Sequence, residues 1–208
     1  MPNVVQQYKK RVTITKLQKA YALLEGAAAN LAASTGCVGK DMACTEIVKS
    51  ENVGKAFIEL GGLKGFEKTD KTVYIRSITC YGQSNCSGSE TWQGFNGFYV
   101  NETQDIGLRI SPGQVVSELQ GVNDAQNYIL VMMITKAKYK HATSFYQGYD
   151  IFYFLIYDNF IVSPVSECPG SVLCPANAYP TTIERNCSKS LFNYHSGWSC
   201  AAKIIKDG

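Results

Sequence analysis

Eight cysteines are the residues of this 208-residue chain with the clearest chemistry. They fall in four close pairs, namely Cys37 and Cys44, Cys80 and Cys86, Cys168 and Cys174, and Cys187 and Cys200. A tetrahedral zinc site uses shorter spacings such as Cys-x-x-Cys, or nearby histidines, and this chain has only His141 and His195. An even number of cysteines at longer spacings is typical of disulfides in an oxidising compartment. We therefore predict disulfides, no metal site and no cofactor.

The pairing of the cysteines is a prediction from proximity. Eight cysteines allow on the order of 100 different pairings, so the sequence does not fix one of them. We predict that each cysteine bonds to its neighbour in the pairs above, which gives four local loops. The first three loops are too short to stabilise the fold much through loop entropy, and we expect them to fix the shapes of loops outside the cell.

Patterns typical of enzymes do not occur in the sequence. It has no G-x-S-x-G nucleophile elbow. The glycine-rich stretch 61–65 lacks the spacing of a phosphate-binding loop and the Ser or Thr that follows one. Glu67 and Asp70 alternate with Lys68 and Lys71, which is typical of a polar turn. We therefore predict that the protein is not an enzyme.

The composition indicates one globular domain with a substantial core. The chain is 45% hydrophobic and 18% charged, and its net charge of +3 is too small to indicate a nucleic-acid partner. One basic cluster stands out, and it lies in a single N-terminal segment. We interpret it as the solvated face of a helix, formed by Lys9, Lys10, Arg11, Lys16 and Lys19.

The apolar pattern predicts a long N-terminal helix followed by a sheet. Over residues 3–33, apolar or small residues recur in steps of three or four, alanines are frequent, and Gly36 offers a stop. A short helical pattern comes next, at Ile47, Val48, Phe57, Ile58 and Leu60. Beyond it the pattern is that of strands, at 73–78, 95–100, 106–110, 128–134, 150–157 and 160–162, with a final strand at 200–205. The predicted fold class is α+β, in which a long N-terminal helix packs on an antiparallel sheet.

Several segments resemble type IV pilin-like and type II secretion pseudopilin-like proteins. The N-terminal stretch 2–21, PNVVQQYKKRVTITKLQKAY, resembles the stretch just after the membrane segment in that family. Similar pieces are Gly36-Cys37 to Ala43-Cys44-Thr45, the stretch 148–154, and the closing residues 197–208. In the family, a cleaved leader and a methylated N-terminal residue precede an apolar helix. This sequence has no such run, so we expect one to precede it in the full-length protein.

The resemblance implies two parts and a structural role. Residues 1–35 would continue a membrane helix, and residues 36–208 would form a pilin-like head with disulfide-pinned loops. The protein would be a subunit of an extracytoplasmic type IV pilus or of a secretion pseudopilus. Its partners would be other pilin or pseudopilin subunits, together with the inner membrane before assembly.

The two halves of the helix have different predicted roles. We expect an exposed upper part that contacts neighbouring helices in a filament, comprising Val5, Tyr8 and Val12. We expect the lower part to pack against the sheet of the same subunit, through Leu17, Tyr21, Leu24, Ala28 and Leu31.

An alternative is a surface-exposed, adhesin-like binding module with an aromatic ligand surface. Two groups of aromatics could form that surface: Trp92, Phe95, Phe98 and Tyr99, and Tyr139, Phe145, Tyr146 and Tyr149. Aromatics are also ordinary strand residues, so the core of a sheet is the simpler explanation for them. A third possibility is a secreted, disulfide-rich hydrolase. The sequence upstream of residue 1 would establish or defeat the pilin class.

Overall fold

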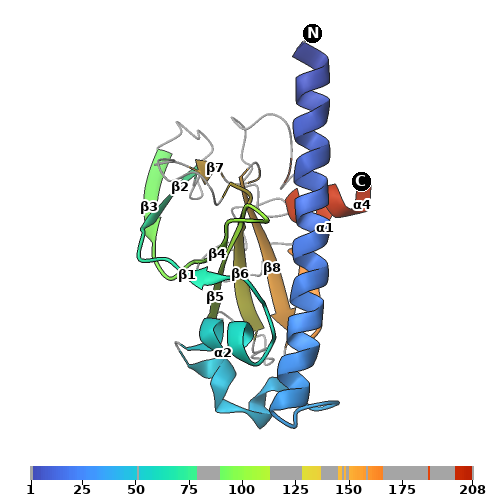
Figure 1. The fold of residues 1–208 in the computed structure, drawn as a ribbon, viewed down its shortest axis with the longest axis vertical. Helices are drawn as coiled ribbons and strands as arrows, with labels where there is room; N and C mark the ends of the chain where they lie inside the picture. Colours follow the sequence, from blue (N-terminus) through green and yellow to red (C-terminus); the bar gives the residue numbers. More distant parts are fainter. Residues whose placement is uncertain are drawn as a thin grey trace, which may run out of the picture.

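A computed structural model describes most of the chain, in several ranges. They are residues 2–50, 52–78, 90–112, 128–136, 145–146, 148, 150–157, 159–165, 187 and 200–207. The fold is α+β, with one long N-terminal helix beside a six-stranded sheet (Figure 1). The fold class predicted from the sequence is confirmed at this level.

The N-terminal helix α1 spans Pro2–Ser34, as the apolar pattern predicted. It ends in a Schellman motif, in which the N–H of Cys37 donates to the carbonyl of Ala32 (2.8 Å) and that of Gly36 to Ala33 (3.2 Å). Gly36 has a φ of 71°, in the left-handed region that favours glycine, so the predicted helix stop is confirmed.

Replacing Gly36 with alanine tests this helix end. No atom lies near the position that a Cβ would take, so the cost comes only from the left-handed backbone. We expect the free energy of unfolding to fall by about 1 kcal/mol, measured by urea denaturation. Gly26→Ala is the matched control, since Gly26 is helical, exposed and also without near neighbours. A Gly36→Ala variant as stable as Gly26→Ala would contradict this prediction.

Three short helices come after α1, and the last of them packs against it. The 3₁₀ turns η1 (Met42–Cys44) and η2 (Glu46–Lys49) precede α2 (Val53–Glu59). The Cys37–Cys44 disulfide joins the end of α1 to η1, with the two Cα atoms 5.9 Å apart. Gly61 lets α2 approach α1 closely, because a Cβ there would lie 3.0 Å from the carbonyl oxygen of Ala27.

The main sheet is antiparallel throughout, in the order β1-β4-β5-β6-β8-β9. Its strands are β1 (Glu67–Lys68), β4 (Tyr99–Asn101), β5 (Ile106–Pro112), β6 (Tyr128–Ile134), β8 (Ile151–Tyr157) and β9 (Val162–Pro164). The central strands β6 and β8 are almost continuously apolar, which indicates that both faces of the sheet are covered.

Alternate residues of these strands contribute to two separate cores. One face packs against the helices through Leu108, Val131, Met133, Phe152, Phe154 and Ile156. The opposite face joins the second sheet through Met132, Ile134, Ile151, Tyr153, Leu155 and Val165. The helices, the main sheet and the second sheet therefore form three layers.

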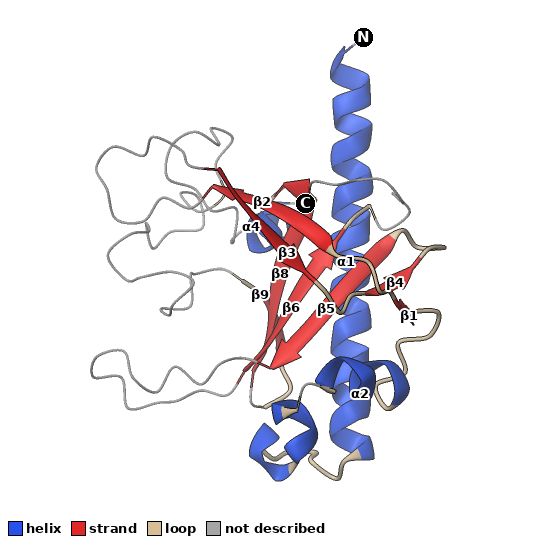
Figure 2. Cartoon of the chain, turned by 90° about the vertical axis from the view of Figure 1, so that its left-hand side faces the viewer, coloured by secondary structure: helices blue, strands red, loops and turns tan. Residues whose placement is uncertain are grey.

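The second sheet has three strands in the order β3-β2-β7. They are β2 (Val73–Ile78), β3 (Glu90–Phe95) and β7 (Phe145–Tyr146), and β7 runs parallel to β2. Figure 2 shows β2 and β3 in front of the main sheet and α1 behind it.

Two predicted strands are wrong. The predicted strand 95–100 is interrupted, because Gly97 has a φ of 80° and the chain leaves β3 at Phe95 to enter β4 of the other sheet at Tyr99. The predicted final strand 200–205 is instead the helix α4 (Cys200–Asp207). There Ala201 and Ala202 favour helix, and Ala201 packs into the helix-side core with Ile204 and Ile205, at helical spacing.

Two of the four predicted disulfides are present. Cys37–Cys44 closes the loop after α1, and Cys187–Cys200 holds the start of α4, with its two Cα atoms 4.8 Å apart. Cys80, Cys86, Cys168 and Cys174 lie outside the described residues.

Candidate functional site

The lower half of α1 is packed tightly against the domain. Buried residues begin at Leu17 and recur in steps of one, three or four, so they line one face of the helix. The buried set is Leu17, Ala20, Leu24, Ala27, Ala28, Leu31 and Ala32, none more than 7% exposed. It includes four of the five residues that the sequence assigned to helix–sheet packing.

Tyr21, the fifth of those residues, is only partly buried. Its ring stacks on that of Phe154 in β8, with centroids 6.2 Å apart, and its hydroxyl donates to the carbonyl of Val162 (3.3 Å). Burial raises the pKa of Tyr21, and the neighbouring Glu25 side chain raises it further. Tyr21 therefore joins α1 to β8 and β9 as a neutral hydroxyl at physiological pH.

The upper half of α1 extends past the sheet. Figure 1 shows the first turns of the helix, toward the N-terminus, standing clear of the strands. At 1.5 Å per residue, the part above Lys16 is roughly 20 Å long. Tyr8 is 68% exposed. The structure does not describe the side chain of Val5.

Val12 is half-buried, which corrects the expectation that it is fully exposed. It lies four residues before Lys16 and thus on the same face of the helix, the face that meets the domain. Val12 therefore marks the end of the contact between helix and head, and Tyr8 lies beyond it.

A polar site forms where α1 leaves the domain. The Lys16 ammonium donates to Asp105 Oδ2 (2.5 Å), to the carbonyl of Asp105 (3.3 Å) and to the carbonyl of Thr135 (2.5 Å). An ammonium has three N–H groups, so each finds an acceptor here. The Lys16 side chain is only 18% exposed. We call Lys16, Asp105 and Thr135 the collar.

The collar connects α1 to turns that are far apart in the sequence. Asp105 ends the turn between β4 and β5 and has a φ of 55°, a left-handed backbone that is uncommon for a residue other than glycine. Thr135 follows β6 and is buried; its N–H and hydroxyl both donate to the carbonyl of Asp150. Asp150 pairs in turn with Lys136 (2.6 Å). One polar network thus joins α1 to the ends of β5, β6 and β8.

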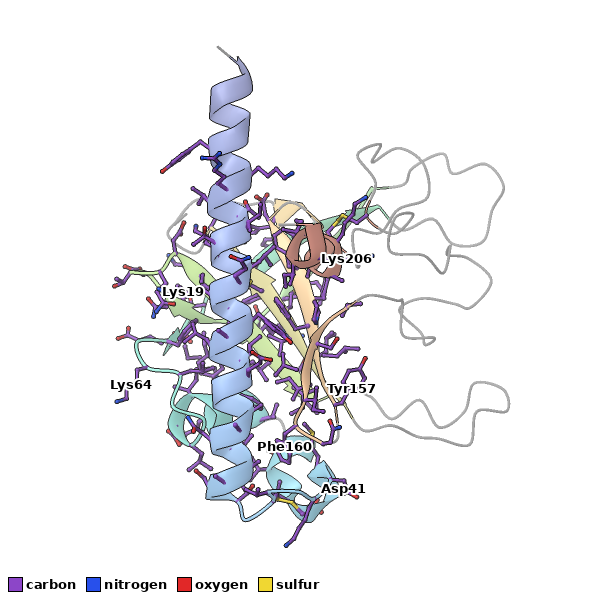
Figure 3. The ribbon with its side chains drawn as sticks, turned by 90° about the vertical axis from the view of Figure 1, so that its right-hand side faces the viewer. Lys19, Asp41, Lys64, Tyr157, Phe160 and Lys206 are labelled. Carbon is purple, nitrogen blue, oxygen red and sulfur yellow. A yellow bond between two sulfur atoms is a disulfide. The ribbon has the colours of Figure 1, made fainter. Side chains whose placement is uncertain are left out.

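The collar corrects the interpretation of Lys16 as part of a solvated face. Lys10, Arg11 and Lys19 are exposed, and Figure 3 shows Lys19 beside the helix. Lys16 instead turns to acceptors that lie 89 and 119 residues away in sequence. No local signal marks those partners. The only hint is its place one residue before the buried stripe begins at Leu17.

A second polar contact joins the two sheets. Arg109 on β5 donates from Nε to the carbonyl of Asn96 (3.0 Å) and from Nη1 to Ser111 Oγ (3.3 Å), and its guanidinium lies 5.4 Å from the Phe95 ring centroid. Burial lowers the pKa of Arg109, but arginine remains charged at neutral pH. These contacts hold β3 and β5 together.

Most of the described aromatic residues serve as core. Phe98 and Phe145 are buried, and Phe95 and Tyr99 are partly buried. Burial raises the pKa of Tyr99. The side chains of Trp92 and Tyr146 are not described, and Tyr139 and Tyr149 lie outside the described residues. The exposed aromatic of this region is Tyr74, at 47%.

The described ranges hold neither a metal-binding cluster nor a membrane-crossing helix. Within them, no three His, Cys, Asp or Glu side chains lie close enough together to hold a metal ion. None of the helices in those ranges combines the length and the apolar character that a membrane crossing needs. The functional candidate is the upper half of α1, which stands clear of the strands, together with the collar below it.

Comparisons with known proteins add no family to this picture: no protein-family model, curated protein or solved structure shows significant similarity to the chain.

Proposed function

We propose that this protein is a structural subunit of an extracytoplasmic filament, a type IV pilus or a type II secretion pseudopilus, which assembles through its N-terminal helix. The observation that supports this most is the division of α1. Among the described side chains of this continuous 33-residue helix, the buried ones begin at Leu17 and Val12 above them is half-buried, while the first turns stand clear of the strands. The resemblance of residues 2–21 to pilin-like sequences agrees with this division.

The division suggests how assembly would be driven. An isolated helix turn in water gains little stability of its own, so a projecting helix is best explained by a partner that buries it. In a filament, the upper halves of neighbouring helices would pack together, and each Å² of apolar surface removed from water would contribute roughly 25 cal/mol. The collar would hold the head in a fixed position on each helix.

Tyr8→Asp in the full-length, membrane-anchored protein tests this role. We expect filament yield to fall by at least about tenfold, because a charge would be buried between packed helices, while the thermal melt of the head stays unchanged. The measurements are a sheared-filament assay and calorimetry of the 208-residue chain.

Ile161→Asp is the matched control, since it also places a charge on an exposed apolar residue, but on the head, where Ile161 is 57% exposed. We expect this variant to assemble normally. Normal assembly of Tyr8→Asp, or a head melt lowered as much as by a core substitution, would contradict the proposal.

The alternative of a binding module with an aromatic surface has less support. Phe98 and Phe145, which would contribute to it, are buried, and Phe95 and Tyr99 are partly buried. None of these four is exposed, and Tyr74, which was not part of the proposed surface, is a single exposed ring and makes a poor ligand platform. We therefore retain the filament subunit as the proposed function.

A further inference from the structure

The charge of this chain is divided unevenly along its length. Residues 1–24 hold five basic residues and no acidic one, so their net charge is +5. The whole chain has 20 basic and 17 acidic residues, so the remainder has 15 and 17, a net charge of −2. The positive charge therefore belongs to the N-terminal helix, and a head of opposite sign follows it.

Within the part of the chain that the structure describes, Lys10, Arg11 and Lys19 have no carboxylate partner, and the side chain of Lys9 is not described. The collar neutralises Lys16 through Asp105. Lys10 and Arg11 are exposed on the upper half of α1, and no carboxylate of that helix precedes Glu25. An anionic partner would neutralise this charge.

The spacing of the basic residues indicates what shape that partner has. Lys9, Lys10 and Arg11 are successive positions of an α-helix, about 100° apart, so they spread over roughly 200° of its circumference instead of lining one side. We call these three residues the basic ring. A helix that lies along a nucleic-acid groove or beside an acidic helix needs a one-sided stripe of charge. A ring suits a helix that meets a charged surface end-on.

We propose that the basic ring binds the anionic phospholipid headgroups of a membrane that α1 meets end-on. Tyr8 supports this choice, because it is exposed directly beside the ring, on the N-terminal side, and tyrosine is enriched at membrane–water interfaces. Two copies of the helix in register would bring identical charges together, so neighbouring helices in the proposed filament would have to be offset along their axes. The proposal does not rest on filament assembly, so it stands or fails separately.

Vesicle sedimentation of the 208-residue chain tests the proposal. The probes are vesicles of phosphatidylglycerol with phosphatidylcholine, and vesicles of phosphatidylcholine alone. We expect binding to the first kind only, weakened by added salt as exposed charges are screened. Each basic residue near an anionic surface contributes about fivefold in affinity. The triple variant Lys9→Gln, Lys10→Gln and Arg11→Gln should therefore bind the anionic vesicles on the order of 100-fold more weakly.

The matched control removes the same charge from the head. Lys64, Lys68 and Lys71 are exposed there, and replacing all three with Gln should leave vesicle binding almost unchanged. An equal loss of vesicle binding in the two triple variants would show that binding depends on net charge alone, and it would overturn the proposal. Failure of the wild-type chain to bind anionic vesicles, or tighter binding to duplex DNA or a poly-glutamate peptide, would also overturn it. If the triple variant of the basic ring has a lowered melting temperature, the single variants Lys10→Gln and Arg11→Gln test the proposal instead. Each of them is expected to lose about fivefold in affinity for the anionic vesicles.

Discussion

Replacing Leu24 with alanine should lower the free energy of unfolding by about 2–5 kcal/mol. Leu24 is fully buried in the middle of the stripe with which α1 packs on the sheet, and its removal leaves a cavity between the helix and the core that it packs against. Urea denaturation of the 208-residue chain, monitored by circular dichroism, measures the change.

Tyr8→Ala is the control for Leu24→Ala. Tyr8 lies on the same helix but beyond the domain, and we expect its replacement to change the free energy of unfolding by less than about 0.5 kcal/mol. If Leu24→Ala and Tyr8→Ala lowered the free energy of unfolding by similar amounts, α1 would pack along its whole length. The assembly role proposed for the upper half would then lose its structural basis.

Lys16→Met is the second substitution with a large expected effect. It keeps the length and apolar body of the side chain but leaves the Asp105 carboxylate and the Thr135 carbonyl without their shared donor. Removing one partner of a fully buried ion pair costs about 3–5 kcal/mol, and the partial exposure of both side chains reduces this to about 2–3 kcal/mol. Urea denaturation measures the loss.

The matched control and a double-mutant cycle identify the source of that loss. Lys19→Met removes the same charge from an exposed position on the same helix, and we expect a change below about 0.5 kcal/mol. Asp105→Asn tolerates the left-handed backbone, so with Lys16→Met it isolates the charge pair. If the losses in the free energy of unfolding simply added in the double variant, Lys16 and Asp105 would not be energetically coupled, and this prediction would be wrong.

The long helix and the core strands were predictable because their signals are local. The apolar steps of α1, the stop at Gly36 and the apolar runs at 128–134 and 151–157 each depend on neighbouring residues alone. The error at 200–205 has the same origin. A run of two alanines and two isoleucines fits both strand and helix, and here the contacts of Ala201, Ile204 and Ile205 with the main core favour the helix.

The collar could not be predicted in this way. Asp105 and Thr135 reach Lys16 only because β4, β5 and β6 align in one sheet and α1 crosses its end, and no pattern near residue 16 encodes that alignment. The second sheet was missed for the same reason. β7 has two residues and pairs with β2 in parallel, across a separation that local periodicity does not detect.

The continuity of α1 across the collar has a mechanical consequence. Between residues 3 and 25 the helix contains no glycine or proline, so it has no hinge, and a pull on its free end reaches the head as a load along the axis. Such a load has to slide the buried stripe from Leu17 to Ala32 past the sheet in one step, because shear strains all these contacts together. The collar is the first point that bears the load. A subunit built this way would resist tension better than one whose helix could be peeled away residue by residue.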